Sequence, residues 1–111
     1  MRAETVAALE SIGFEKSWCG SPDCQMLRKM VVCPKSKLHL VIEVAKEEHG
    51  RLEVRVSLAS EEGWMVLLSY AVADEVEGLD VEALVEDSMK RVSEKLVEVA
   101  QAAAQVAMTG M

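Results

Sequence analysis

The sequence predicts an α+β domain with a short N-terminal helix, a four- or five-stranded antiparallel meander and a long C-terminal helix packed on the sheet. Apolar residues recur at every third or fourth position near both ends of the chain, and they alternate with polar residues from Lys37 to Ala59. Loops that end in glycine separate the alternating runs. The 111 residues are enough for one core and too few for two. We therefore expect residues 1–111 to form a single domain with its helices against one face of the sheet.

The first helix is predicted between Arg2 and Ile12. Val6, Leu9 and Ile12 follow one another at three-residue spacing, which is typical of the buried side of a helix. Gly13 comes next, where a helix favours a residue that adopts a left-handed conformation.

Two runs of alternating residues predict the central hairpin. Even-numbered positions are apolar from Leu38 to Val44 and again from Leu52 to Leu58, so these positions must oppose one another. A three-residue loop, Glu48-His49-Gly50, preserves that parity. The resulting register sets Glu43 opposite Arg55 and Glu47 opposite Arg51, and such pairs of opposite charge stabilise a sheet.

A second loop of the same kind, Glu61-Glu62-Gly63, leads into a third strand over residues 64–73. An unbroken register then pairs Val66 with Leu58, Leu68 with Val56, and Tyr70 with Val54. The odd-numbered side of this strand is apolar where the other strands carry charges, and it consists of Met65, Leu67, Ala71 and Ala73. Either another segment of the chain covers that side, or the side is an interface with a subunit or a peptide.

Residues 26–33 read as a further strand of unassigned register, and residues 14–19 as one more. If these two strands form a hairpin, Gly20-Ser21-Pro22-Asp23 is its loop and Cys19 faces Cys24. The separation of facing residues is close to that of a disulfide, so a Cys19–Cys24 bridge is predicted, with two reduced thiols beside a turn as the alternative.

The C-terminal helix is predicted to begin after Asp80, an N-cap residue, and to run for about 28 residues, or roughly 42 Å. A strand of the sheet is shorter, so the helix should extend beyond the sheet. The extending part carries an apolar stripe, Leu96, Val99, Ala103 and Val106. Either a second copy covers this stripe, which predicts a homodimer, or residues 103–111 form a frayed tail.

A metal site is weakly indicated by Cys19, Cys24, Cys33 and His39. Structural zinc sites use cysteine and histidine ligands, but in closely spaced pairs, and here only Cys19 and Cys24 approach such a pair. No phosphate-binding loop, nucleophile elbow or zinc-protease motif occurs in the sequence. We therefore expect no enzyme activity and no cofactor.

Charge and composition limit the partners. The net charge of −7 argues against binding to nucleic acid, which requires a basic face. No segment has the ~18 apolar residues of a membrane span, and the N-terminus lacks the features of a targeting peptide, so a cytoplasmic location is expected. The chain has no asparagine, which is typical of thermophiles, whereas its three cysteines and seven methionines argue against that source.

The sequence thus predicts a non-enzymatic interaction module that is dimeric and binds itself or a protein or peptide partner. The expected interface consists of the apolar strand side and the C-terminal helix. The alternative is a small-molecule or metal-binding protein, or an enzyme, built around Cys19, Cys24, Cys33 and His39.

Overall fold

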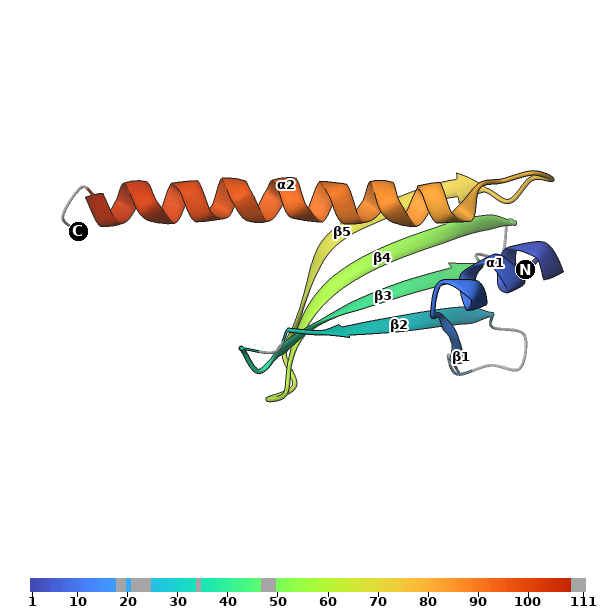
Figure 1. The fold of residues 1–111 in the computed structure, drawn as a ribbon, viewed down its shortest axis with the longest axis horizontal. Helices are drawn as coiled ribbons and strands as arrows, with labels where there is room; N and C mark the ends of the chain where they lie inside the picture. Colours follow the sequence, from blue (N-terminus) through green and yellow to red (C-terminus); the bar gives the residue numbers. More distant parts are fainter. Residues whose placement is uncertain (18–19, 21–24, 34, 47–49, 109–111) are drawn as a thin grey trace.

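A computed structural model of the chain describes residues 1–17, 20, 25–33, 35–46 and 50–108. Within these residues, two helices pack on one side of a five-stranded sheet in which every pair of neighbouring strands is antiparallel and the strands follow in chain order (Figure 1). The elements are α1 (Ala3–Ser11), β1 (Glu15–Ser17), β2 (Met26–Val32), β3 (Leu38–Lys46), β4 (Arg51–Ser60), β5 (Met65–Asp74) and α2 (Val81–Met108). This arrangement confirms the predicted α+β class.

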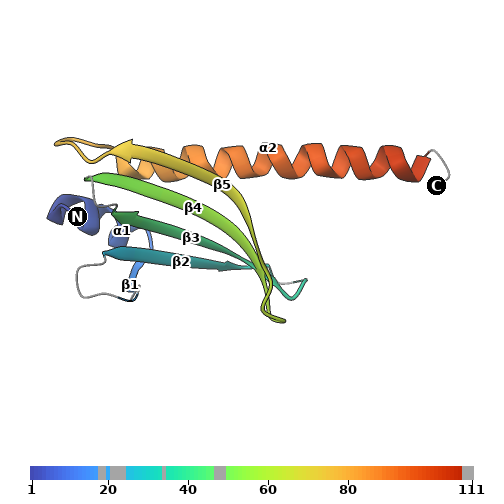
Figure 2. The same ribbon diagram turned by 180° about the vertical axis from the view of Figure 1, so that it is seen from behind.

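Both helices pack against the same side of the sheet, which we call the helix face. The core there joins Leu9 of α1 and Val92 of α2 to Val44 and Val54 of the central strands, all at most 2% exposed. Seen from behind, the sheet lies in front of α2 (Figure 2). We call this other side the open face, and no described helix packs on it.

The register of β3 and β4 is as predicted. Glu43 lies opposite Arg55, and Leu40 lies opposite Leu58. The alternating apolar positions are what holds this register, because a slip by one residue would turn every core side chain toward water. The predicted pairing of Glu47 with Arg51 lies outside the described residues.

The register of β4 and β5 agrees with the prediction only at its beginning. Val66 lies opposite Leu58, but a β-bulge follows, so that Val56 opposes Ser69 and Val54 opposes Ala71. The predicted pairing of Leu68 with Val56 is therefore wrong, and so is that of Tyr70 with Val54. The physical reason is one extra residue, Leu68, in the bulged strand, which reverses the parity of every later position.

The N-terminal strands form the predicted hairpin over the described residues, although β1 has only three of them. Ser17 pairs with Met26, and on its other edge β2 pairs with β3, which sets Arg28 opposite Glu43. The sequence left this second register open because Arg28 and Lys29 interrupt both faces. Cys19 and Cys24 lie outside the described residues, so their bridge stays a prediction.

The long helix begins as predicted. The side chain of Asp80 accepts a hydrogen bond from the Ala83 N–H at 3.1 Å, which satisfies one of the free donors of the first turn. The helix then continues for 28 residues to Met108, so Ala103 and Val106 are helical, and residues 109–111 lie outside the described part.

Candidate interaction surfaces

The C-terminal half of α2 projects beyond the sheet, as Figures 1 and 2 both show. The first half of the helix buries Val81, Val85, Ser88 and Val92. The same spacing of three and four residues then continues through the overhang stripe, which we define as Leu96, Val99, Ala103 and Val106. Leu96 is 45% exposed, Val99 61% and Val106 55%. The apolar stripe of α2 is therefore about twice as long as the part of it that the sheet covers.

Two features of the fold produce this overhang. A 28-residue helix is about 42 Å long, whereas a ten-residue strand spans only about 33 Å. In addition, β4 and β5 bend away from the straight helix at the ends joined by the Ser60–Met65 turn (Figures 1 and 2). A bulge bends and twists its strand, so the extra residue in β5 is a local cause of this departure.

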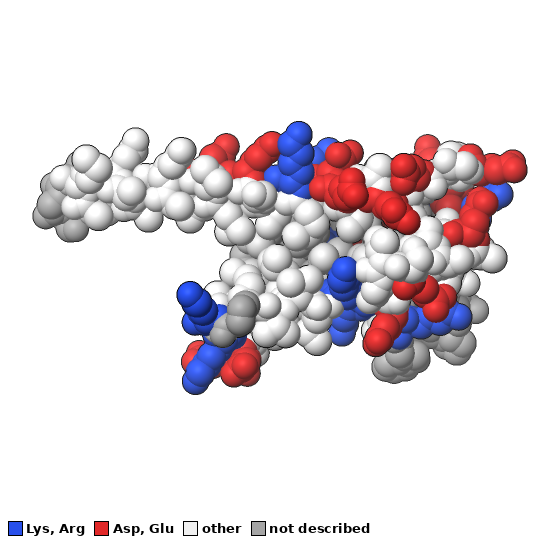
Figure 3. Space-filling view, viewed as in Figure 1, with Lys and Arg blue, Asp and Glu red and all other residues white. Residues whose placement is uncertain are grey.

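The departing sheet and the projecting helix leave a notch between them. On the sheet side of the notch, Val31, Leu40, Leu58 and Val66 follow one another across four strands on the helix face. Val31 is 39% exposed and Val66 50%, because α2 does not reach them. Figure 3 shows uncharged atoms along the overhang and on the adjoining part of the sheet, with charged side chains at the tip of the sheet and over the other half of α2. The notch thus has two apolar walls, the overhang stripe and the end of the sheet.

A second apolar surface lies on the open face, near the same end of the sheet. Two adjacent rows of cross-strand neighbours form it, and we call it the open-face patch: Val32, Ala59 and Met65 with His39 in one row, and Met30, Val41, Ser57 and Leu67 in the other. The residues from the outer strands are more than half exposed, whereas Val41, Ser57 and Ala59 in the middle are buried. Exposed apolar side chains therefore flank a buried floor.

Ion pairs border this patch. Arg28 Nη2 lies 3.2 Å from Glu43 Oε2, and Arg55 Nε lies 3.1 Å from Glu53 Oε1. Glu43 is only 9% exposed, so its pairing with Arg28 is partly shielded from water. These two ion pairs form the polar border of the open-face patch.

The four strand residues predicted as one interface do not share a side. Met65 and Leu67 precede the bulge and lie on the open face, whereas Ala71 and Ala73 follow it and lie on the helix face. Ala71 packs against the core there. Sequence reasoning missed Met30 and Val32, which β2 brings to the open-face patch, because the register of that strand could not be assigned.

The predicted metal ligands are not brought together within the described residues. Cys33 has a free thiol and is half-buried, and its backbone N–H donates to the Leu38 carbonyl. His39 belongs to the open-face patch, while Cys19 and Cys24 lie outside the described part. No group of three histidine, cysteine or carboxylate side chains gathers as a metal site in the part that the structure describes.

A hollow of about 530 Å³ lies between α1 and the first two strands. Its described lining is mixed, with Val6 and Leu27 beside the charged Glu10 and Lys16. The volume is in the range of small-molecule sites, but the described lining contains none of the predicted cysteine or histidine ligands. The hollow therefore does not combine with Cys33 and His39 into one site.

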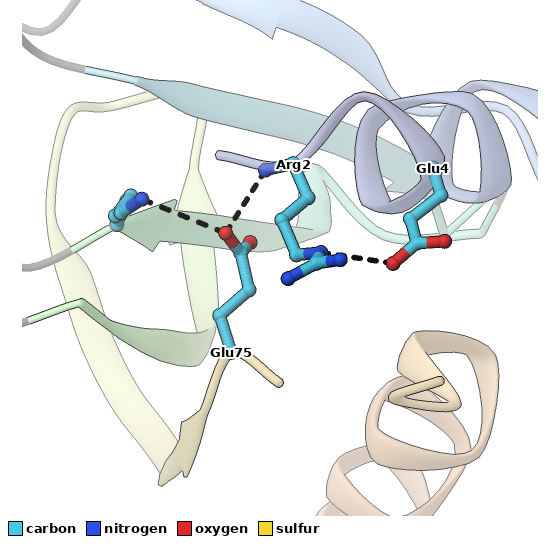
Figure 4. A network of polar contacts seen from close by, with 4 residues as sticks. Arg2, Glu4 and Glu75 are labelled. Carbon is cyan, nitrogen blue, oxygen red and sulfur yellow. Dashed lines mark hydrogen bonds and ion pairs between the residues drawn. The ribbon is translucent and has the colours of Figure 1, made fainter. Parts of the chain in front are cut away.

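The buried carboxylate of Glu75 lies between the start of α1 and the end of β5. Glu75, whose side chain is 2% exposed, accepts a hydrogen bond from the Arg2 backbone N–H at 2.9 Å, and its Oε1 lies 3.6 Å from Lys46 Nζ (Figure 4). Arg2 in turn pairs with Glu4. Burial and the nearby Lys46 lower the pKa of the Met1 α-amine, and Glu75 acts in the opposite direction. This cluster ties the start of α1 to the residue that follows β5.

The fold and its surfaces define an α+β meander domain with an apolar notch and an apolar open face. The chain matches no protein-family model, no curated protein and no solved structure. Within the described residues, no helix combines the length and apolar character required to cross a membrane.

Proposed function

We propose that the protein is a non-enzymatic interaction module, dimeric and cytoplasmic, that binds a second copy or another protein through the notch and the open-face patch. The observation that carries this proposal is the continuation of the buried stripe of α2 into Leu96, Val99 and Val106, each at least 45% exposed. A stripe of this kind stabilises a protein only when it is covered, at about 25 cal/mol per Å² of apolar surface removed from water.

The open-face patch supports the same function. Monomeric soluble proteins rarely expose contiguous apolar patches of more than a few hundred Å². Here Met30, Val32, Met65 and Leu67 are between 54% and 71% exposed, and they surround a buried floor on a face that no described helix covers. Flexible methionine side chains adapt to apolar partners of different shapes.

Native mass spectrometry of the purified chain tests this function. We expect a dimer without added mass, or a complex with another protein. A monomer that carries a metal ion or a small molecule would favour the alternative built on Cys19, Cys24, Cys33 and His39, and would overturn the proposal. Substitution of Cys19, Cys24 and Cys33 by serine gives the control, because dimer formation should not depend on these thiols.

A further inference from the structure

We infer that the notch is filled by a second copy of this chain, with the two α2 overhangs packed antiparallel about a twofold axis near residue 101. Each overhang would lie between the partner's overhang and the end of the partner's sheet. This inference rests on the proposed function and names the occupant of one of its two surfaces.

The spacing of the overhang stripe suits such a symmetric contact. Leu96, Val99, Ala103 and Val106 are separated by three, four and three residues. The stripe therefore matches the stripe of a second, antiparallel helix, with Leu96 of one chain against Val106 of the other and Val99 against Ala103. A twofold interface requires this property, because the same patch must bind its own copy.

Side-chain size also suits a close antiparallel contact. Both predicted pairs join a larger side chain to a smaller one, which lets facing layers interdigitate. Ala100, Ala102 and Ala107 adjoin the stripe. Small residues at these positions allow two helices to approach at the short end of the usual 8–10 Å range.

The charge distribution favours overlap at this end of the molecule. Each copy carries a net charge of −7, yet no charged residue occurs from Val99 to Met108. The carboxylates gather over the other half of α2 and over the sheet (Figure 3). Antiparallel overhangs would hold the two acidic bodies at opposite ends of the dimer, where the repulsion between them is screened.

A stable dimer requires more buried area than the two overhangs provide, so the end of the sheet must also take part in the contact. Leu96 to Met108 form a helical strip about 20 Å long and about 10 Å wide, on the order of a few hundred Å². Stable interfaces bury about 800 Å² on each partner, so two overhangs alone are too small. The exposed Val31 and Val66 at the end of the sheet supply the additional apolar surface when the partner's helix enters the notch.

Light scattering coupled to size exclusion tests the occupant with a matched pair of variants. Val99→Arg places a cation in the overhang stripe, whereas Ser93→Arg places the same charge at an exposed position of α2 that precedes the overhang stripe. At roughly 100 μM, where a dimer with a dissociation constant of ~1 μM is assembled, we expect a dimer for the wild type and for Ser93→Arg. Val99→Arg should raise the dissociation constant by about 100-fold or more.

Disulfide trapping tests the antiparallel direction. In a chain whose native cysteines are replaced by serine, Leu96→Cys and Val106→Cys are made separately and then mixed. The antiparallel arrangement brings Cys at 96 against Cys at 106 of the other chain, so crosslinks should form between the two variants. Like positions would be ~15 Å apart along the axis, too far for a disulfide, so abundant crosslinks within either variant alone would overturn the arrangement.

Failure of this inference differs from failure of the proposed function. Suppose that the wild type is a dimer. Suppose also that Val99→Arg leaves this dimer intact, whereas Leu67→Arg, on the open-face patch, dissociates it. The second copy would then bind the open face, and the inference would fail while the proposed function stands. A wild-type chain that remains monomeric at roughly 100 μM, carrying a metal ion or a small molecule, would contradict both.

Discussion

Ser69 of β5, and not Leu68, lies opposite Val56 of β4. This single offset turns Ala71 and Ala73 toward the helices, and it leaves Met65 and Leu67 on the open face. The strand can therefore complete the core at one end and present an apolar surface at the other. Without the offset, Ala71 and Ala73 would lie on the open face beside Met65 and Leu67.

The bulge predicts opposite outcomes for two neighbouring residues. Ala71→Asp would place a carboxylate on the helix face against the core and should lower the free energy of unfolding by about 2–3 kcal/mol. Val72→Asp would place the same carboxylate on the open face, where Val72 is 38% exposed, and should cost less than about 1 kcal/mol. Urea denaturation followed by circular dichroism measures both.

The two variants introduce the same side chain at adjacent positions of β5, and these positions lie on opposite faces of the sheet. An unbroken register would place Val72, and not Ala71, on the helix face. If Val72→Asp proves the more destabilising variant, the bulge is absent, and Ala71 and Ala73 lie on the open face together with Met65 and Leu67.

The secondary structure was predictable because local patterns determine it. Period-two alternation located β3 and β4, and the cross-strand charges Glu43 and Arg55 placed them in register. The three-residue loop before Trp64 was also predictable, and Gly63 indeed has a φ of 103°, in the region that favours glycine. These features depend on residues a few positions apart in the chain or directly across a hairpin.

The surfaces were only partly predictable. The overhang followed from the lengths of the helix and the strands, so Leu96, Val99, Ala103 and Val106 were found. The bulge at Leu68 carries no glycine or other local signal, so the register of β5 beyond Val66 could not be predicted. The two rows of the open-face patch required the register of β2, which its sequence does not determine.

The buried Glu75 should anchor the first helix. Glu75→Ala removes the acceptor of the Arg2 N–H and the partner of Lys46, so we expect a loss of about 1–2 kcal/mol in the free energy of unfolding. The amides of Thr5 and Val6, which donate to the Arg2 carbonyl, should exchange with solvent faster. Hydrogen exchange followed by NMR measures this local effect.

Two further variants check the role of Glu75. Glu75→Gln keeps an oxygen for the Arg2 N–H and should cost less than Glu75→Ala. Glu77→Ala removes an exposed carboxylate nearby and should leave exchange in α1 unchanged. Equal protection of Thr5 in the Glu75→Ala variant and the wild type would show that this contact does not hold the helix.

A count of free thiols tests the predicted Cys19–Cys24 disulfide directly. In the described part of the hairpin, Ser17 pairs with Met26, and this is the register on which the prediction depends. Titration of the protein denatured without reductant should find one free thiol, that of Cys33, and a Cys33→Ser variant should show none. Three free thiols in the wild type would rule the bridge out. A short loop limits the expected stabilisation to about 2 kcal/mol.

The Arg28–Glu43 pair should contribute more to stability than an exposed pair does. Its side chains are 42% and 11% exposed, whereas those of Arg2 and Glu4 are 43% and 57% exposed. Water screens the Arg2–Glu4 pair more strongly than the Arg28–Glu43 pair. A double-mutant cycle of Arg28→Met and Glu43→Gln should therefore give a coupling energy of about 1 kcal/mol. The matched cycle of Arg2→Met and Glu4→Gln should give less than about 0.3 kcal/mol. Urea denaturation of all the variants supplies the energies. Equal coupling energies would mean that water reaches Glu43 on the open face as readily as it reaches an exposed residue. That result would contradict the description of these ion pairs as the border of an apolar patch.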